Sequence, residues 1–219
     1  TLFLLVLYGA WPHFISTTLS VGPFQLQAEE KKLSIAHFNP FAGNLDHPAI
    51  TKEVLRIDAD LVSLVEIDPS MKLTIIPALQ VKYPYSYDCS GTDYCQNIIL
   101  SKYPILNGDG QGHWIGPPYS RVHLGGEMTG VTFVSVHTTR FPQSRDQIRQ
   151  VRELLRLLES ESGDLIVMGD FNATPFSRIT TTLEQGANIR RLTDLPTWPS
   201  RIHLPQVAID HAFASENFR

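Results

Sequence analysis

The stretch Asp164-Leu-Ile-Val-Met-Gly-Asp-Phe-Asn172 joins an apolar run to a glycine and two polar side chains. Leu165 to Met168 predict a short interior strand, because continuous apolar runs are typical of strands buried on both faces. Gly169 allows the backbone to turn or to approach another segment closely. Alternation would then place Asp170 and Asn172 on one face at the carboxyl end of the strand. A carboxylate beside a carboxamide suits a phosphate oxygen or an activated water, whereas an Asx-turn accounts for the same residues without any function.

Polar side chains follow four other apolar runs in the same way. The runs cover residues 33–38, 61–65, 131–136 and 207–209, and the residues that follow them are Asn39, Glu66, His137 and Asp210. This set offers an amide and a carboxylate for a hard divalent cation, with a histidine and further acids for proton transfer. The side chains converge only if the strands share sheets and end at a common edge.

Six short motifs in these regions resemble those of the endonuclease/exonuclease/phosphatase family, whose members are metal-dependent phosphoesterases. The motifs are Ala36-His-Phe-Asn39, residues 60–66 with their terminal glutamate, 97–104 (Asn-Ile-Ile-Leu-Ser-Lys-Tyr-Pro), Ser135 to Thr138, Gly169 to Asn172, and Ile209-Asp-His211. Each motif is weak alone, but together they occur in the family's order across residues 33–219. The segment 194–199, followed by the strand at Asp210, is similar to the bacterial membrane-anchored branch of the family. The resemblance implies an α/β fold, a four-layer sandwich of two mainly antiparallel sheets flanked by helices.

The resemblance also implies a role for each candidate residue. Glu66 would be the direct carboxylate ligand of Mg²⁺, with Asn39 as the second metal-site residue and Mn²⁺ as the alternative ion. Asp170 would orient or deprotonate the attacking water. Asn172 would hold one phosphate oxygen, and His137 would contact another.

Asp210 has a further implied role, which is to orient a histidine from a Ser-Asp-His segment near the end of the family's domain. No Ser-Asp-His tripeptide occurs in the 219 residues. His211 cannot replace it, because adjacent strand residues point to opposite faces. We therefore expect the chain to be truncated at its carboxyl end, and at its amino end as well, since it opens on Thr1. A fragment without that histidine would be expected to lose orders of magnitude in rate.

Several candidates have a structural alternative. Asn39 precedes Pro40 and could simply begin a turn, and His137 could be a hydrogen-bonded histidine at a strand end. Arg140 could hold an anionic substrate through bidentate contacts, but it could equally be a solvated loop charge. Glu66 is harder to explain structurally, because an ionised carboxylate after an apolar run is costly to bury without a cation or partner.

The amino-terminal residues 1–32 differ in character from the domain expected over residues 33–219. Leu2 to Ala10 are almost wholly apolar, yet they have only about half the length that a transmembrane helix needs. They predict the tail of a membrane anchor, a signal-sequence core or a packed helix. Cys89 and Cys95 enclose five residues and could form a disulfide or remain reduced thiols. The two features together favour a membrane-tethered domain outside the cytoplasm.

The charge of the chain bears on its substrate. The net charge is −4 and the isoelectric point about 6.0, so no overall basic field favours duplex DNA. The predicted function is hydrolysis of a phosphodiester or phosphomonoester, carried by a lipid headgroup, a small molecule or a nucleic acid. The alternatives are a phosphate-binding module without turnover and a nuclease. Nothing in the sequence indicates a protein partner.

The spacing of apolar residues and the positions of turn residues predict the strands and helices. Strands are expected near residues 33–39, 60–66, 83–88, 97–101, 121–124, 131–138, 164–169 and 206–214. Helices are expected near residues 47–58, 70–80, 144–162 and 176–185, the third of them amphipathic with its arginines facing water.

Overall fold

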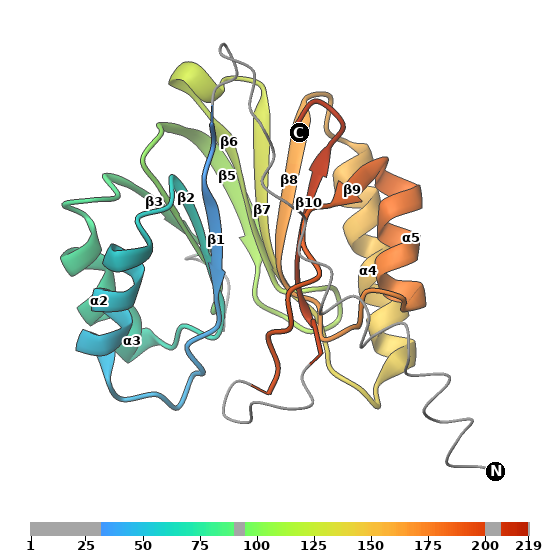
Figure 1. The fold of residues 1–219 in the computed structure, drawn as a ribbon, viewed down its shortest axis with the longest axis horizontal. Helices are drawn as coiled ribbons and strands as arrows, with labels where there is room; N and C mark the ends of the chain where they lie inside the picture. The colour runs from blue at the N-terminus through green and yellow to red at the C-terminus, as the bar shows by residue number, and fades with distance from the viewer. Residues whose placement is uncertain (1–31, 90–94, 200–206, 219) are drawn as a thin grey trace.

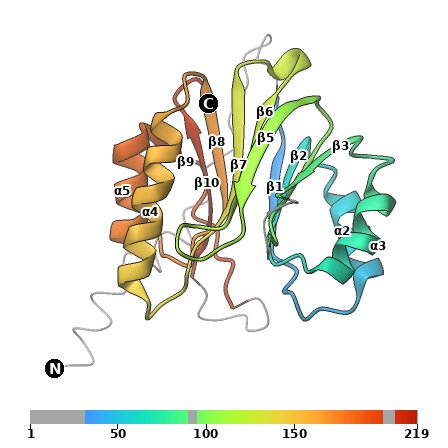
Figure 2. The same ribbon diagram turned by 180° about the vertical axis from the view of Figure 1, so that it is seen from behind.

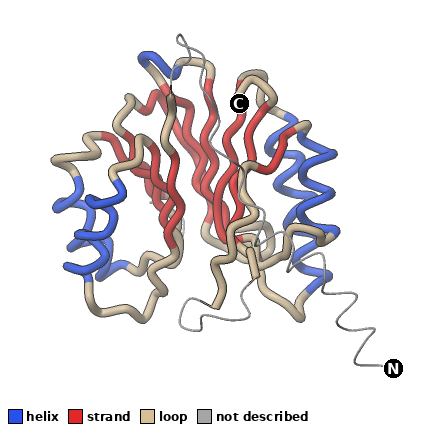
Figure 3. Tube along the Cα trace, in the orientation of Figure 1, coloured by secondary structure: helices blue, strands red, loops and turns tan. Residues whose placement is uncertain are grey.

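Two β-sheets lie face to face, and a pair of helices covers the outer side of each (Figure 1). The computed structural model describes residues 32–89, 95–199 and 207–218. The helix, sheet, sheet and helix layers are also visible from behind and in the tube coloured by secondary structure (Figures 2 and 3). The predicted α/β sandwich of two mainly antiparallel sheets flanked by helices is confirmed.

The smaller sheet has four strands in the order β1-β2-β4-β3. Their bounds are Ile35–Phe38 for β1, Leu61–Leu64 for β2, Tyr85–Asp88 for β3 and Ile98–Ser101 for β4. Only β1 and β2 are parallel, and helix α2 (His47–Ile57) makes the crossover that a parallel pair requires. Helix α3 (Pro69–Leu79) follows β2, and both helices bury apolar residues such as Val54 and Met71 in one cluster with the sheet.

The larger sheet has six strands in the order β5-β6-β7-β8-β10-β9. Their bounds are Ile105–Gln111 for β5, Tyr119–Leu124 for β6, Val131–His137 for β7, Asp164–Asp170 for β8, Ile189–Arg191 for β9 and Asp210–Ser215 for β10. Strands β7 and β8 are parallel and are joined by helix α4 (Ser144–Glu159). Helix α5 (Arg178–Ala187) packs beside α4, and a short 3-10 helix covers Gly126–Met128.

Apolar side chains fill the space between the sheets, among them Leu61 and Ile99 from the smaller sheet and Phe133 and Ile166 from the larger. Strands β2, β4, β7 and β8 are buried along almost their whole length. Continuous apolar runs therefore correspond to the central strands, as their sequences predict.

The predicted strands and helices are all present, with shifts at their ends, but β5 and β9 were not predicted. Strand β5 reads Ile-Leu-Asn-Gly-Asp-Gly-Gln and β9 has three residues. Each lies at an edge of the larger sheet, where partial exposure removes the apolar signal that marks a central strand. The strand expected at 206–214 is β10, and it begins at Asp210. Asp210 therefore starts a strand, contrary to the prediction that it ends one.

The expected anchor and linker over residues 1–32 lie outside the described residues except for Lys32. Within the described ranges, no helix is both long enough and apolar enough to cross a membrane.

Candidate active site

The strand ends carry most of the candidate residues to one edge of the sandwich, which is the lower edge in Figure 1. Asn39 directly follows β1, and Glu66 lies two residues beyond β2. His137 and Asp170 are paired last residues of the parallel strands β7 and β8. Asp210 pairs with Asp170 from the other side, because β10 runs antiparallel to β8. An antiparallel strand brings its first residue to the edge where its neighbour ends, which is why Asp210 joins the group.

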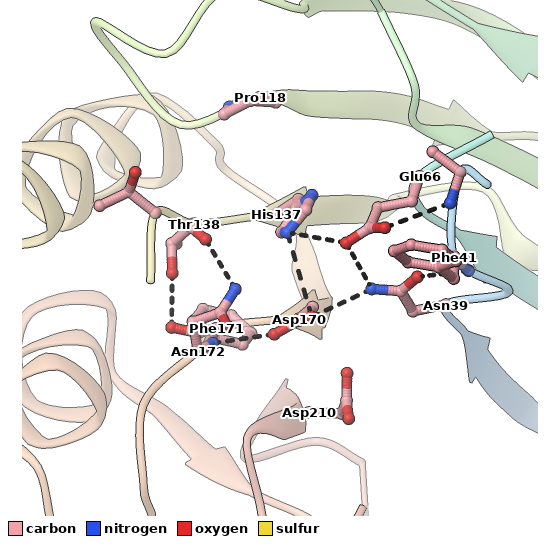
Figure 4. A network of polar contacts seen from close by, with 12 residues as sticks. Asn39, Phe41, Glu66, Pro118, His137, Thr138, Asp170, Phe171, Asn172 and Asp210 are labelled. Carbon is pink, nitrogen blue, oxygen red and sulfur yellow. Dashed lines mark hydrogen bonds and ion pairs between the residues drawn. The ribbon is translucent and has the colours of Figure 1, made fainter. Parts of the chain in front are cut away.

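Two carboxylates meet around one amide at this edge (Figure 4). The Nδ2 atom of Asn39 donates to Oε1 of Glu66 at 3.0 Å and to Oδ2 of Asp170 at 3.2 Å. Its Oδ1 atom accepts the backbone N–H of Phe41 at 2.9 Å. The second oxygen of Glu66 accepts from the backbone of Ala42 at 3.3 Å. Asn39 therefore holds the carboxylates together, while its role as a cation ligand stays a prediction.

His137 forms a group with Glu66 and Asp170. Each of the three offers one atom that could bind a metal ion, and these atoms lie within 4.8 Å of one another. The Nε2 atom of His137 lies 3.8 Å from Oε1 of Glu66 and 4.0 Å from Oδ2 of Asp170, too far for direct hydrogen bonds. Burial lowers the pKa of His137 to about 4, although the nearby charge of Glu66 acts to raise this pKa. The imidazole is therefore neutral at physiological pH.

Asp170 is the most deeply buried of the acidic candidates, with 6% of its surface exposed. Burial, with a further contribution from the charge of Asp210, raises its pKa to about 7. A carboxylate with a pKa near neutrality can accept a proton from a bound water at physiological pH. The environment of Asp170 thus suits a general base.

Gly169 allows this carboxylate to stand at the end of a buried strand. Its φ is +157°, and a Cβ added there would lie 1.8 Å from the backbone oxygen of Val136 on the neighbouring strand. Only a residue without a side chain fits, so the predicted close approach of the backbone is present.

Asn172 follows in a left-handed conformation with φ of +46°. Its backbone N–H donates to Oδ1 of Asp170 at 2.9 Å, which is the hydrogen bond of an Asx-turn. Its Nδ2 donates to the backbone oxygen of Thr138 at 2.9 Å, leaving the amide's second N–H for another acceptor. The turn and the candidate site are thus the same structure. Glu66 also has a positive φ, of +57°, and such backbone conformations gather at functional sites.

His37 belongs to the site although the sequence did not single it out. Its Nε2 lies 3.1 Å from Oδ1 of Asp210, and its Nδ1 lies 3.0 Å from the hydroxyl of Ser63. That hydroxyl contacts the hydroxyl of Ser135 at 2.7 Å, and both serines are fully buried. The chain of contacts crosses between the two sheets. The available signal was alternation, which places His37 on the same face as Asn39 two residues later.

Four further residues lie beside the site or near it. Arg140 is exposed in the loop after β7, and its contact with substrate stays a prediction. The ring of Trp114 meets the ring of His137 edge-on, with centroids 5.0 Å apart, whereas Trp198 is exposed on the loop before β10. His211 points away from Asp210, as expected, and its Nε2 contacts the backbone oxygen of Ala173 at 2.7 Å.

Cys89 and Cys95 are joined as a disulfide, with their Cα atoms 5.5 Å apart. The bridge closes the segment between β3 and β4 at the same edge as the site. Of the two states that the sequence allows for this cysteine pair, the structure therefore has the disulfide and not two reduced thiols.

The residues fit a hard divalent cation. Glu66 and the buried Asp170 share a single amide donor, and the raised pKa of Asp170 reflects the cost of charging it in this environment. A cation beside the two carboxylates would offset that cost, since carboxylate oxygens are the ligands Mg²⁺ prefers. Histidine is a less usual ligand for Mg²⁺, so His137 fits the predicted contact with a phosphate oxygen better than direct coordination.

Comparisons with solved structures give the same fold at low sequence identity. Sphingomyelinase C from Streptomyces griseocarneus is 16% identical with a TM-score of 0.68, the match covering 85% of each chain. A magnesium-bound double mutant of Staphylococcus aureus beta toxin is 14% identical with a TM-score of 0.70 and 86% coverage of each chain. An endonuclease/exonuclease/phosphatase family protein from Bacteroides thetaiotaomicron is 15% identical with a TM-score of 0.67, and the match covers 84% of this chain and 83% of the other. A comparison with curated proteins gave no match.

The family model described as "Endonuclease/Exonuclease/phosphatase family" matches residues 36–219. That range holds both sheets apart from Ile35, and every candidate site residue from Asn39 to Asp210. The chain therefore belongs to the endonuclease/exonuclease/phosphatase family.

Proposed function

We propose that this protein is a Mg²⁺-dependent phosphoesterase that hydrolyses a phosphodiester or phosphomonoester by attack of a water molecule. The observation that carries the proposal is the convergence of Glu66, His137 and Asp170, whose ligand atoms lie within 4.8 Å of one another. The family match and the magnesium bound to the beta toxin mutant support it. Mn²⁺ is the alternative ion.

Each residue has a distinct task in the reaction. Asp170 orients the water and accepts its proton as the water oxygen attacks phosphorus, and the bond to the leaving-group oxygen breaks. The second N–H of Asn172 and the neutral ring of His137 donate to phosphate oxygens, where negative charge is held in the transition state. Glu66 and Asn39 form the cation site. A bound Mg²⁺ supplies positive charge against the phosphate and the leaving group.

We further propose that the domain is tethered to a membrane through residues 1–32 and faces a compartment outside the cytoplasm, as in a membrane-anchored bacterial branch of the family. The apolar run from Leu2 to Ala10 supports the tether. The disulfide between Cys89 and Cys95 supports an oxidising compartment. With a net charge of −4, a lipid headgroup or small phosphoester suits the protein better than a nucleic acid.

Hydrolysis of bis(4-nitrophenyl) phosphate by the purified full-length protein tests the proposal. Activity should require Mg²⁺, disappear with EDTA, and fall by about a hundredfold or more on Glu66→Gln or Asp170→Asn. Asp164→Asn is a matched control at the opposite end of β8, and Glu159→Gln is a control at the exposed end of α4. Equal activity in the site and control variants would contradict the assignment.

Titration with Mg²⁺ separates the enzyme from a binding module without turnover. The binding module should show a rise in Tm on Mg²⁺ addition that depends on Glu66, with no hydrolysis. The enzyme should show both the rise in Tm and hydrolysis.

A further inference from the structure

Exposed apolar side chains gather around the candidate site. Five of the loops that reach its edge cover residues 39–46, 112–118, 138–143, 171–177 and 192–199. Eight of the thirteen large apolar side chains exposed in the described residues lie in these loops. Every loop contributes at least one, with Leu45, Ile115, Phe141, Phe176, Leu195 and Trp198 among them. We call this set the apolar rim.

The rest of the described surface lacks such a cluster. The other five exposed large apolar residues are divided among α2, α3 and the turn after it, β3 and β5. Single exposed apolar residues are ordinary on a soluble surface, whereas a cluster marks a surface that another apolar body covers. Leu45, Phe141 and Ile115 are 85%, 80% and 73% exposed, so their side chains are not held in the core.

The rim is continuous with the site. Trp114 belongs to it, and its ring contacts the ring of His137. Phe41 also belongs to it, and its backbone N–H donates to the Oδ1 atom of Asn39. A body that covers the rim therefore lies directly over the carboxylates.

The composition of the apolar rim indicates which kind of molecule or surface binds there. A protein seated on the rim would close the site that the rim surrounds, and a small soluble phosphoester needs no apolar surface around it. A nucleic acid needs cations against its phosphates, but the described residues of these loops hold one arginine, Arg140, against Asp46 and Asp194. Exposed aromatic and aliphatic side chains with little net charge suit the interface of a zwitterionic bilayer.

We propose that the apolar rim docks the protein on a zwitterionic phospholipid surface, and that the site takes its phosphoester from a lipid headgroup at that surface. The second part rests on the proposed phosphoesterase function, whereas docking does not. Docking would place the mouth of the site at headgroup level, with the tips of the rim in the interfacial region.

Partition onto phosphatidylcholine vesicles tests docking apart from catalysis. Sedimentation is measured with the full chain carrying Glu66→Gln, so that no substrate is consumed. Adding Leu45→Ser, Ile115→Ser and Leu195→Ser should lower the partition coefficient at least tenfold. The matched control replaces Leu73, Val81 and Leu106, which are comparably exposed away from the rim, by serine and should stay within twofold. All variants share residues 1–32, so equal partition of the rim and control variants would overturn the proposal.

Tryptophan quenching tests the orientation. In a chain with Trp11→Phe and Trp114→Phe, Trp198 is the sole tryptophan, and brominated phosphatidylcholine should quench its emission. In a tryptophan-free chain, the tryptophan introduced by Val81→Trp, beyond α3 at the opposite edge, should not be quenched. Equal quenching at the two positions would also overturn the proposal.

Hydrolysis of bis(4-nitrophenyl) phosphate by the same rim variant distinguishes the two proposals. In the chain with Glu66 retained, the rim substitutions should leave this soluble reaction within twofold of the parent. Rim-dependent partition without hydrolysis by the parent would support docking and contradict the phosphoesterase. Hydrolysis with rim-independent partition would contradict docking alone.

Discussion

One amide nitrogen of Asn39 donates to both Glu66 and Asp170, at 3.0 Å and 3.2 Å. Asn39 and Glu66 follow strands of the smaller sheet, whereas Asp170 ends a strand of the larger sheet. The contact therefore links the two sheets at the site and offsets part of the repulsion between the carboxylates. Its effect on stability and on cation binding can be separated by experiment.

Asn39→Asp should destabilise the cation-free protein, because it replaces the shared donor by a third negative charge. We expect the free energy of unfolding at pH 8 in EDTA to fall by about 1–3 kcal/mol, and Mg²⁺ to restore part of the loss. Urea denaturation with and without Mg²⁺ measures both. Asn107→Asp, on the exposed part of β5, is the control, and an equal loss there would contradict the role of Asn39.

Asp170→Asn should change how stability depends on pH. The folded pKa of Asp170 is raised from 3.8 to about 7, so between these values the folded protein binds a proton that the unfolded chain has released. In cation-free protein, this group makes the free energy of unfolding fall as pH rises, by up to about 1.4 kcal/mol per pH unit.

His137 contributes with the opposite sign. Its folded pKa is lowered from 6.5 to about 4, so its contribution raises stability as pH rises through that window. The two contributions offset each other in the parent. Asp170→Asn removes the fall, so the free energy of unfolding of the variant should rise with pH through the contribution of His137. Urea denaturation in EDTA from pH 4 to pH 7 measures this, and parallel curves for parent and variant would refute the assigned shifts.

His37→Leu should destabilise the protein by about 2 kcal/mol at pH 7, because Asp210, whose side chain is only 20% exposed, then loses its histidine partner. His37→Gln keeps a hydrogen-bond donor and should recover part of the loss. Adding Asp210→Asn to His37→Leu removes the stranded charge, so a double-mutant cycle should give a coupling of about 1 kcal/mol or more. Additive effects in urea denaturation would show that the two residues do not interact.

Gly169→Ala should cost about 3 kcal/mol or more, since the added Cβ would lie 1.8 Å from the backbone oxygen of Val136. Gly130→Ala is the matched control, because Gly130 has a φ of +92° but no atom within 4 Å of an added Cβ. Only backbone strain acts there, and the loss should be about 1 kcal/mol. Thermal unfolding compares the two variants, and similar losses would argue against the close approach at Gly169.

Strand-end patterns predicted much of the group that meets at the site edge. Asn39, Glu66, His137 and Asp170 were identified because each follows or ends an apolar run, and the structure brings them together. The catalytic roles implied by the family resemblance stay predictions. Edge strands β5 and β9 were missed because half-exposed, polar or very short segments carry little apolar periodicity.

The sequence by itself determined which residues form the buried strands and which polar side chains stand at their ends, because alternation and apolar runs are local properties of the chain. Only the tertiary structure decided that Asp210 begins a strand and pairs with His37, and that loops far apart in sequence form one apolar rim. Those relationships depend on sheet order and strand direction. Such long-range contacts are set by packing, and no local spacing encodes them.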